Sequence, residues 1–582
     1  MKMILMSSIV LLLFAVNTFA GETLPNGIAL PDGWPPKRTG ELTRDPLETP
    51  PYLRSPPAVI PIDVGRQLFV DDFLVENTTL TRTHRRRGSL ARAHLPEYYP
   101  GNPVIAPEKP WEMKEGRSRA GVFSDGVFYD PADQLFKCWY WAAYVSTQPL
   151  QGRTCYATSR DGIHWEKPSL DVVPGTNIVL VDDPGISRNS STEWLDLDEK
   201  NPQRRFKMFR VVMEERVLNG KKQIHKWMKI SFSHDGVHWK LAAETDECGD
   251  RSTVFYNAMR KVWVYSLREG GKLVSRCRGY VETPDPLQGI RWGDSKTSKK
   301  VMWVGADQLD PAREDLVLRR IPERPWDLVP SQLYNLDCVA YESLLLGEFS
   351  IWRGHPLKDR PKINEVCVGF SRDGFHWSRP DRRAFCPVSE KKEAWNWGNV
   401  QSAGGCCLVV GDKLYFYVGA ANGRSNVDPS NVGLAILRRD GFTSMDAGAQ
   451  EATLTTRKVK FTGKRLFVNV DAPKGKLVAE ILDEDGKGIA PFARANCIPV
   501  STDNTIQEVI WKGAKDLSVL AGKPVRFRFH LTNGSLYAFW VSPDASGASH
   551  GYVAAGGPGF TGISDTVGLG AYQAGEKLRQ ER

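Results

Sequence analysis

Several patterns that identify common protein classes are missing from this 582-residue sequence. After the first 20 residues no apolar run is long enough to cross a bilayer, which excludes a multispanning membrane protein. No C-x-x-C pair occurs and the ten histidines form no ligand cluster, so we expect no metal site and no cofactor. The excess of nine basic charges is spread along the chain, which argues against a nucleic-acid partner. Helical periodicity is almost absent.

A disulfide framework is also missing, although ten cysteines are present. Most stand alone in apolar, strand-like runs, and Cys406 and Cys407 are adjacent. This distribution is typical of buried free thiols. A bridge between Cys138 and Cys155 remains open, because the two lie on segments that we expect to be neighbouring strands.

The first 61 residues are unlike the rest of the chain. Lys2 precedes an apolar run that ends in Thr18-Phe19-Ala20, the pattern of a secretory signal cleaved near Ala20. We therefore expect residues 1–20 to be a signal peptide and the protein to be exported to the periplasm or the cell exterior, with no membrane span in the mature chain. Nine prolines lie between Pro31 and Pro61, which favours an extended lead-in over residues 21–61.

A repeated heptapeptide dominates the middle of the chain. Its pattern is S-x-D-G-x-x-W, and a degenerate copy and a partial copy extend the series to five. The copies are Ser159–Trp165, Ser233–Trp239, the degenerate Glu282–Trp292, Ser371–Trp377 and the partial Arg439–Phe442. Four of the 18 tryptophans therefore recur at one position of the repeat.

The repeat predicts a tight hairpin turn. Asp-Gly supplies the positive φ values of such a turn, while the Ser and Asp side chains cap its free amides. Further strand signals precede each copy, so each repeat corresponds to about four short antiparallel strands. Five such sheets predict a five-bladed β-propeller over residues 62–447. A β-sandwich with coincidental turns is the alternative.

The pattern changes after Gly448. Alternating strand signals such as Leu466–Val470 and Pro524–Phe529 are separated by turn residues at Asp485-Gly486 and Asn533-Gly534. They predict a separate β-sandwich over residues 448–565, in which the aromatic run Tyr537–Trp540 is core. Residues 566–582 are expected to be a C-terminal tail. The predicted fold class is therefore all-β.

This arrangement of repeat hairpins followed by a sandwich resembles glycoside hydrolase families 32 and 43 and exported bacterial proteins similar to family 32. The resemblance covers about residues 62–560. It implies a carbohydrate substrate and a reaction centre where the first strand of each blade lines the central channel. The Asp of each repeat is then structural.

The resemblance also implies catalytic carboxylates. Carried over blade by blade, Asp250 would be the transition-state stabiliser and Glu342 the general acid. Asp125 is our choice for the blade-one nucleophile or base, and Asp71 and Asp72 compete for that place. Two carboxyls flanking the scissile bond, one protonated and one ionised, are what glycoside hydrolysis needs.

Other residues ahead of or within the predicted inner strands are candidates for substrate binding. The arginines could pair with the acids or bind a sulfate or uronate, and the tryptophans could stack on a sugar ring. The predicted set is Arg117, Glu193, Arg251, Trp395, Trp397, Asn399 and Gln401.

The sequence thus favours an exported glycoside hydrolase acting on a plant or algal oligo- or polysaccharide, with a furanoside as one candidate. A non-catalytic carbohydrate-binding propeller and a glycoside phosphorylase on the same fold remain alternatives.

Overall fold

The computed structural model describes residues 21–38, 41–83, 94–113, 118–142, 152–218, 220–271, 274–293, 300–310, 330–354, 362–392, 394–421 and 430–580. The predicted all-β class is confirmed at this level, because strands make up nearly all of its regular structure. The α-helices among these residues are α1 (Pro51–Arg54) and α2 (Leu569–Gln580). Neither is long and apolar enough to span a bilayer. The predicted signal peptide lies outside the described residues.

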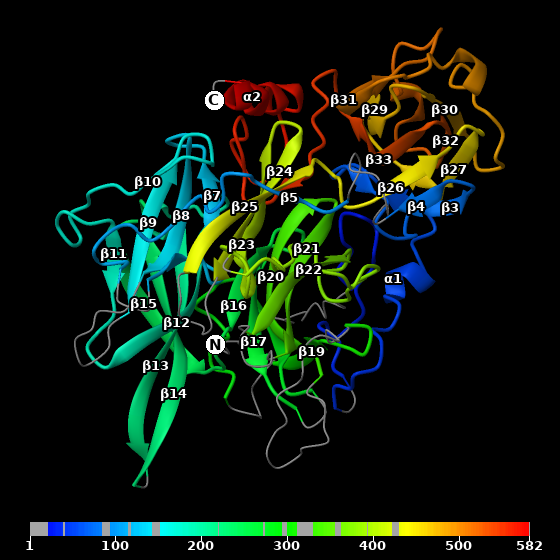
Figure 1. The fold of residues 1–582 in the computed structure, drawn as a ribbon. Helices are drawn as coiled ribbons and strands as arrows, with labels where there is room; N and C mark the ends of the chain where they lie inside the picture. Colours follow the sequence, from blue (N-terminus) through cyan, green and yellow to red (C-terminus); the bar gives the residue numbers. More distant parts are fainter. Residues whose placement is uncertain are drawn as a thin grey trace, which may run out of the picture.

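Three separate sheets follow one another along the chain (Figure 1). Each runs mostly antiparallel, as the turn-rich sequence predicts. The first contains β6 (Ala120–Gly121), β7 (Val127–Asp130), β8 (Leu135–Ala142), β9 (Arg153–Ser159), β10 (Trp165–Glu166) and β11 (Ile178–Val181). The second contains β12 (Ile186–Leu195), β13 (Phe206–Leu218), β14 (Lys221–Ser233) and β15 (Lys240–Glu247). The third contains β16 (Thr253–Asn257), β17 (Val262–Glu269), β18 (Cys277–Thr283) and β19 (Val301–Gly305).

The next two groups of strands share one sheet. They are joined by a short parallel pairing of Asn364 with Asn399. The sheet contains β20 (Gln332–Glu342), β21 (Leu344–Gly354), β22 (Ile363–Ser371), β23 (Asn399–Val410), β24 (Lys413–Ala421) and β25 (Ser430–Arg438), with β5 (Glu97–Tyr98) and β34 (Tyr552–Val553) at its edges.

The leading strands of these five groups meet at the centre; we call β7, β12, β16, β20 and β23 the inner strands. Gly126 beside β7 bridges Gly404 of β23, and its amide also reaches the Glu193 carboxylate of β12. The Val254 amide of β16 donates to Thr192 of β12, while Thr253 donates to a backbone carbonyl of β20. Hydrogen bonds between β20 and β23 complete this succession. Each inner strand therefore contacts the next, and the last contacts the first.

The three full repeats form the predicted capped hairpins. In the first, Asp161 accepts hydrogen bonds from the backbone amides of Ile163 and His164, and Ser159 accepts from the amide of Gly162. The copies at Asp235 and Asp373 form the same bonds. The sequence repeat is thus a repeat of hydrogen bonding.

Each of these turns is also fastened to a neighbouring group of strands, which is the last group for the first turn and the preceding group for the other two. An aromatic side chain of that group donates to a backbone carbonyl inside the turn, and the repeat tryptophan packs against the same region. The bonds run from Tyr417 to Gly162 (2.5 Å), from Trp139 to Gly236 (2.7 Å) and from Trp303 to Phe375 (2.7 Å). The recurring tryptophans therefore hold neighbouring sheets together.

A second set of sheets combines the two ends of the chain, at the upper right in Figure 1. Thr78 pairs with Leu454, and Gln67 pairs with Phe539. The N-terminal strands are β1 (Ile60–Pro61), β2 (Gln67–Leu68), β3 (Val75–Thr78) and β4 (Thr81–Thr83). The C-terminal strands are β26 (Ser444–Ala447), β27 (Ala452–Thr456), β28 (Val459–Lys460), β29 (Arg465–Asp471), β30 (Lys476–Leu482), β31 (Asp503–Val509), β32 (Arg526–Thr532) and β33 (Gly534–Ser542).

This pairing differs from the boundaries expected from sequence. Residues 62–83 were expected to begin the propeller, but their strands belong with the C-terminal strands. The physical reason is that strand pairing across more than 370 positions leaves no local periodicity to read. The expected tail also contains α2.

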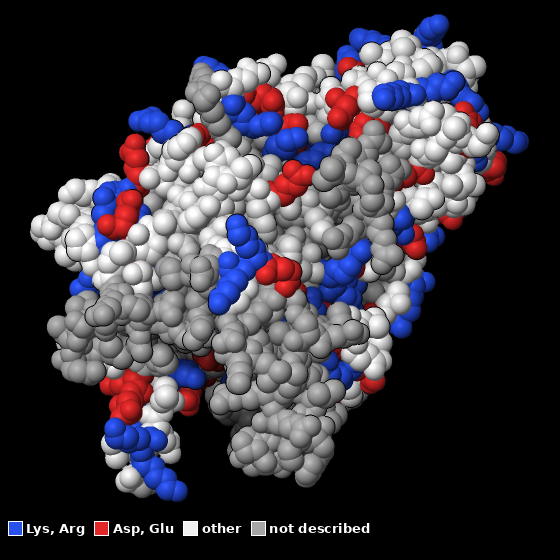
Figure 2. All heavy atoms as spheres, in the orientation of Figure 1, with Lys and Arg blue, Asp and Glu red and all other residues white. Residues whose placement is uncertain are grey.

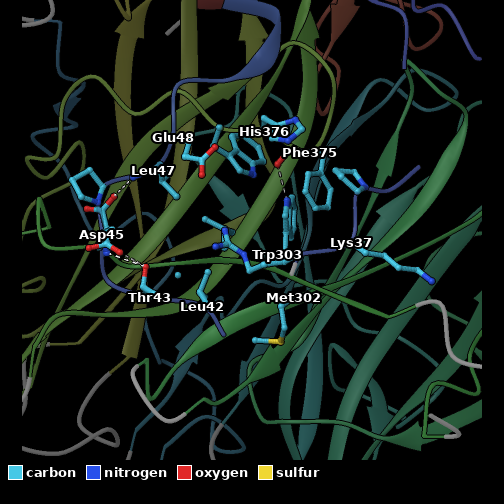
Figure 3. Close-up of a pocket in the computed structure, with 17 residues that line it drawn as sticks. Lys37, Leu42, Thr43, Asp45, Leu47, Glu48, Met302, Trp303, Phe375 and His376 are labelled. Atoms are coloured by element: carbon cyan, nitrogen blue, oxygen red, sulfur yellow. Dashed lines mark hydrogen bonds between the residues drawn. The ribbon is translucent and has the colours of Figure 1, made fainter. Parts of the chain in front are cut away.

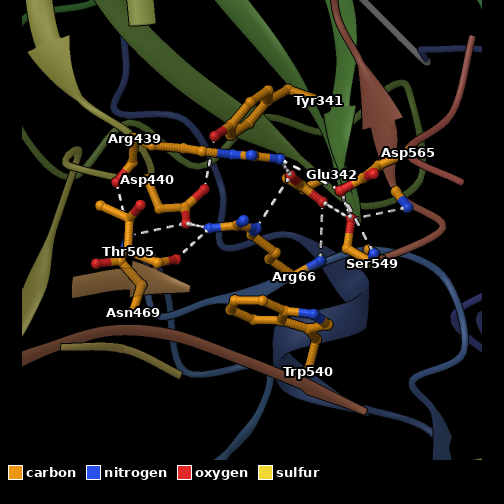
Figure 4. Close-up of polar contacts among 12 residues, drawn as sticks. Arg66, Tyr341, Glu342, Arg439, Asp440, Asn469, Thr505, Trp540, Ser549 and Asp565 are labelled. Carbon is orange, nitrogen blue, oxygen red and sulfur yellow. Dashed lines mark hydrogen bonds and ion pairs between the residues drawn. The ribbon is translucent and has the colours of Figure 1, made fainter. Parts of the chain in front are cut away.

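Buried ionic contacts join the two sets of sheets (Figure 4). The guanidinium of Arg66 lies 3.5 Å from Glu342 and 2.9 Å from Asp440, and its face lies 4.1 Å from the centre of the Trp540 ring. Arg439 lies 2.9 Å from Glu342. Arg66, Glu342 and Arg439 have no exposed surface.

Charge on the described surface is mixed. In Figure 2 the atoms of Lys and Arg are interspersed with those of Asp and Glu over the face shown.

Replacing Arg66 with Met should lower the free energy of unfolding by about 3–5 kcal/mol, because it leaves Glu342 and Asp440 buried with less compensating charge. Chemical denaturation followed by tryptophan fluorescence would measure the change. Arg383→Met is the matched control, since Arg383 pairs with Asp381 while half exposed and should cost about 1 kcal/mol or less. Equal effects of the two substitutions would contradict a joining role for Arg66.

Candidate functional site

The inner strands are irregular where they meet. Ser124 and Arg251 have φ values of 68° and 63°, in the left-handed region that non-glycine residues rarely adopt. The strand register shifts after Arg188 in β12, after Leu333 in β20 and after Ser402 in β23. Strain and bulges of this kind gather at functional sites, where they redirect side chains. Because the left-handed residues and the register shifts occur together where the inner strands meet, this region is the candidate site.

Asp125 occupies the strained turn that precedes β7. It has no exposed surface and forms an ion pair with Arg188 of β12. Its other oxygen accepts the backbone amide of Phe123 at 2.6 Å. Burial raises the pKa of Asp125, while the charge of Arg188 opposes the shift and favours the ionised form. The contact with Arg188 fixes the orientation of this carboxyl.

Glu193 of β12 lies beside Asp125 and is also fully buried. The Ser191 hydroxyl donates to it at 2.5 Å, and the Gly126 amide donates at 3.2 Å. Burial raises the pKa of Glu193 to about 7, and the negative charge of Asp125 adds to the shift. Glu193 is therefore poised to hold a proton near neutral pH. We call Asp125 and Glu193 the acid pair.

A third buried carboxyl, Asp337 of β20, closes the cluster on the opposite side. It accepts hydrogen bonds from Ser402 at 2.6 Å, from Asn335 at 2.9 Å and from Ser124 at 3.0 Å. Burial raises the pKa of Asp337. Through Ser124 this carboxyl is linked to the turn that carries Asp125.

Arg251 connects this centre to β23. Its guanidinium donates to the side-chain carbonyl of Gln401, and Gln401 in turn donates to Asn399 at 2.9 Å. It also lies over the ring of Phe123, 3.0 Å from the ring centre. Burial lowers the pKa of Arg251 to about 9. The structure thus brings together Asp125, Glu193, Arg251, Asn399 and Gln401 from the predicted set.

Other predicted acids lie elsewhere. Glu342 ends β20 five residues beyond Asp337, in the contacts of Figure 4, and is not joined to the acid pair. In this position it stabilises packing between sheets. Asp250 is partly exposed and lies 3.5 Å from Arg268. It neighbours Arg251 in sequence but forms no hydrogen bond with the central residues among the described contacts.

The competing acids also lie apart from Asp125. Asp71 is buried and pairs with Arg372 of the third hairpin at 2.9 Å. Asp72 is exposed and pairs with Arg82. Both belong to the segment that pairs with the C-terminal strands, so neither occupies the place of a blade-one acid.

The two tryptophans expected to stack on sugar serve as packing residues. Trp397 is buried, and Trp395 lies edge-on to Tyr98 with 5.2 Å between ring centres. The ring of Trp395 also covers Gly433 so closely that an added Cβ would lie 2.1 Å from it. Trp397 therefore offers no open indole face, and the ring of Trp395 is covered where it meets Gly433. Arg117 lies outside the described residues.

Sequence reasoning missed Arg188, Asn335 and Asp337. A signal for them exists, because Asn335 and Asp337 alternate with apolar residues in Gln332–Glu342, and Arg188 lies in the polar start of Ile186–Leu195. Polar residues within strands otherwise rich in apolar residues indicate a lined channel or a functional face. No group of three or more metal-ligating side chains occurs in the described part of the chain. All ten cysteines are free and buried, including Cys138 and Cys155.

A separate cavity of about 430 Å³ lies between the lead-in segment and the edge of the third sheet (Figure 3). Trp303, Phe375 and Leu42 line it, together with Asp45 and Glu48. Trp303 already has a structural role, because its indole N–H donates to the backbone carbonyl of Phe375 in the third hairpin.

Glu193 should make stability depend on pH. Its folded-state pKa of about 7 lies above its ordinary value of 4.5. The stability that its proton provides is therefore complete below about pH 4.5 and lost as pH rises through about 7. Because Glu193→Gln cannot ionise, its stability relative to the wild type should rise by about 3 kcal/mol between these limits. Denaturation midpoints of both proteins across pH 4–8 measure this difference, and a constant difference would contradict a raised pKa.

A scan of protein families finds no match, and neither does a search of curated proteins. Solved structures resemble the chain at low identity. An N-acetylgalactosamine deacetylase from F. plautii in complex with blood group B trisaccharide is 13% identical, with a TM-score of 0.38 over 60% of this chain and 97% of that one. A member of the GH130 family of mannoside phosphorylases and glycoside hydrolases is 14% identical, with a TM-score of 0.33 over 61% and 96%. The Bombyx mori GH32 β-fructofuranosidase is 9% identical, with a TM-score of 0.34 over 77% and 94%.

Proposed function

We propose that this protein is an exported glycoside hydrolase whose reaction centre is the acid pair. The observation that carries the proposal is the pairing of two carboxyls with different environments on adjacent inner strands. Glu193 has a pKa of about 7, while Asp125 contacts the Arg188 guanidinium. One protonated and one ionised carboxyl is the combination that glycoside cleavage uses.

In this mechanism Glu193 is the general acid. Its proton passes to the oxygen of the leaving sugar as the glycosidic bond breaks. Asp125 is the nucleophile, or the base that activates water, on the other side of the anomeric carbon. The positive charge of Arg188 favours the ionised form of Asp125. After Glu193 has given its proton to the leaving group, its carboxylate can accept a proton in the next step. Glu193 is thus assigned the role of general acid that the sequence predicts for Glu342.

A substrate needs access to these buried carboxyls. Phe123, two residues before Asp125, is partly exposed and carries Arg251 over its ring. Arg188 also lies 5.5 Å from the ring centre of Trp141. A sugar ring that displaces the Arg251 side chain from Phe123 would meet an aromatic face beside the acid pair.

The proposal includes the architecture predicted from sequence. Five groups of strands whose inner strands contact one another in succession support a five-bladed propeller, and the paired terminal strands support a β-sandwich beside it. Secretion is proposed from the N-terminal sequence pattern. A plant or algal glycan is the proposed substrate class.

Glu193→Gln should lower kcat on unactivated oligosaccharides by at least about a thousandfold, because it removes the proton donor. Activity on aryl glycosides with acidic leaving groups should fall much less, since these leave without protonation. The wild-type kcat/KM should decline as pH rises above about 7, and the variant should lack this decline. A panel of plant and algal glycans would first be screened for cleavage. Initial rates measured on the substrates that are cleaved would then supply these values.

Glu166→Gln is the control, because Glu166 is exposed in β10 and should leave all rates unchanged. Unaltered hydrolysis by Glu193→Gln would overturn the assignment of the acid. Binding of glycans without cleavage by the wild type would favour the non-catalytic alternative, and turnover that requires inorganic phosphate would favour a phosphorylase.

A further inference from the structure

Three cationic side chains surround Tyr334 at the start of β20. The Lys362 ammonium lies 4.4 Å from the centre of the Tyr334 ring, and the guanidinium carbons of Arg276 and Arg251 lie 5.0 Å and 5.5 Å from it. Lys362 also donates to the Tyr334 hydroxyl at 2.7 Å. Cations from the connection before β18, from the residue before β22 and from the turn before β16 thus surround one tyrosine ring.

Among the described residues, none of these three cations has a carboxylate in contact. Arg276 donates to the amide oxygen of Gln332 at 3.2 Å, and Lys362 reaches the phenol. The hydrogen bonds of Arg251 go to side-chain amide oxygens and to the Phe123 carbonyl. Asp337, Asp250 and Asp125 act electrostatically on Arg251, but none of them forms a described ion pair with it.

Among the described residues, positive charge exceeds negative charge around Tyr334, where Arg251 is buried and Arg276 and Lys362 are partly exposed. Burial and the two neighbouring guanidinium groups lower the pKa of Lys362. The same three cations lower the pKa of Tyr334 even though its burial acts in the opposite direction. Unbalanced charge of one sign in a protein interior is costly, and it is retained where a ligand of the opposite sign completes the site.

The backbone is distorted at two of these residues. The register of β20 shifts between Leu333 and Asn335, which makes Tyr334 the extra residue of a bulge. Arg251 has a φ value of 63°. The charge cluster and the backbone irregularities are independent observations, and both mark this end of the inner strands.

The cluster adjoins the acid pair. Arg251 donates to the carbonyl of Phe123, whose amide is bound by Asp125. A group held between Arg251, Arg276 and Lys362 would therefore belong to a sugar close to the scissile bond.

We infer that Arg251, Arg276, Lys362 and the Tyr334 hydroxyl form a subsite for an oxyanion carried by the substrate, so that the enzyme acts on acidic glycans. A sugar carboxylate or a sulfate ester supplies the required chemistry, since both accept charge-assisted hydrogen bonds from arginine and lysine. This inference rests on the proposed function for its place in the reaction, whereas binding of the oxyanion can be measured without turnover.

Calorimetry with matched oligosaccharides tests the subsite. One set contains uronic acids and their carboxyl-reduced counterparts, and a second contains sulfated glycans and their desulfated counterparts. The wild type should bind the acidic member of at least one set at least about a hundredfold more tightly than its neutral counterpart. Arg276→Gln and Lys362→Gln should each weaken that binding at least about tenfold and leave the weak neutral binding unchanged. Lys512→Gln, at an exposed position, is the charge-matched control.

The set that shows the preference identifies the oxyanion as carboxylate or sulfate. Equal binding of acidic and neutral glycans by the wild type would overturn the inference, as would unchanged acidic binding in both variants. Tighter binding of inorganic phosphate than of either acidic glycan would also overturn it. The thermal unfolding midpoint of each variant establishes that it is folded, and Tyr334→Phe provides a milder change at the same place. Glu193→Gln could still bind acidic glycans while neither the wild type nor any variant hydrolyses them. That result would refute the proposed function but support the subsite.

Discussion

In the described part of the chain, most of the fully buried arginines form ion pairs with carboxylates, and the arrangement of the sheets depends on that pairing. Arg66 and Arg439 join the terminal strands to the end of β20 through Glu342, and Arg372 ties the third hairpin to Asp71. Arg188 fixes Asp125 between the first two groups of strands. A buried arginine without such a partner is destabilising, so these pairs restrict how the sheets can assemble. Arg251 has no carboxylate in contact among the described residues, and we propose that a ligand oxyanion occupies the place beside it.

The repeat performs the complementary task of closing one group of strands onto the previous one. Its Asp and Ser residues satisfy the turn amides, and its Trp packs beside an aromatic residue that donates into the turn. One heptapeptide therefore encodes both a hairpin and its attachment. With the sheets held in this way, the inner strands can carry bulges and left-handed residues at their centre, because regular pairing further out supplies the stability.

Local patterns predicted the hairpins, the all-β class and several of the central residues. Asp125, Glu193, Arg251 and Gln401 were found because each precedes or begins an expected inner strand. Glu342 was assigned because its strand corresponds to the fourth blade of the similar families. The position along a strand, however, decides whether a side chain reaches the centre. Glu342 lies at the end of β20, five residues beyond the central Asp337. The pairing of residues 62–83 with the C-terminal strands is a long-range contact. Neither the alternation of residues along a strand nor the heptapeptide repeat indicates such a contact. Arg188 escaped notice because its role depends on which carboxylate the fold brings to it.

The proposed reaction requires a sugar to bind at the acid pair, and a crystal structure would test this most directly. An acidic oligosaccharide recognised by the wild type would be bound intact to the Glu193→Gln variant. The predicted result places a glycosidic oxygen about 3 Å from the side chain at position 193 and the acidic group of the sugar between Arg276 and Lys362. A sugar bound instead in the cavity beside Trp303 and Phe375, with the acid pair still enclosed, would contradict it.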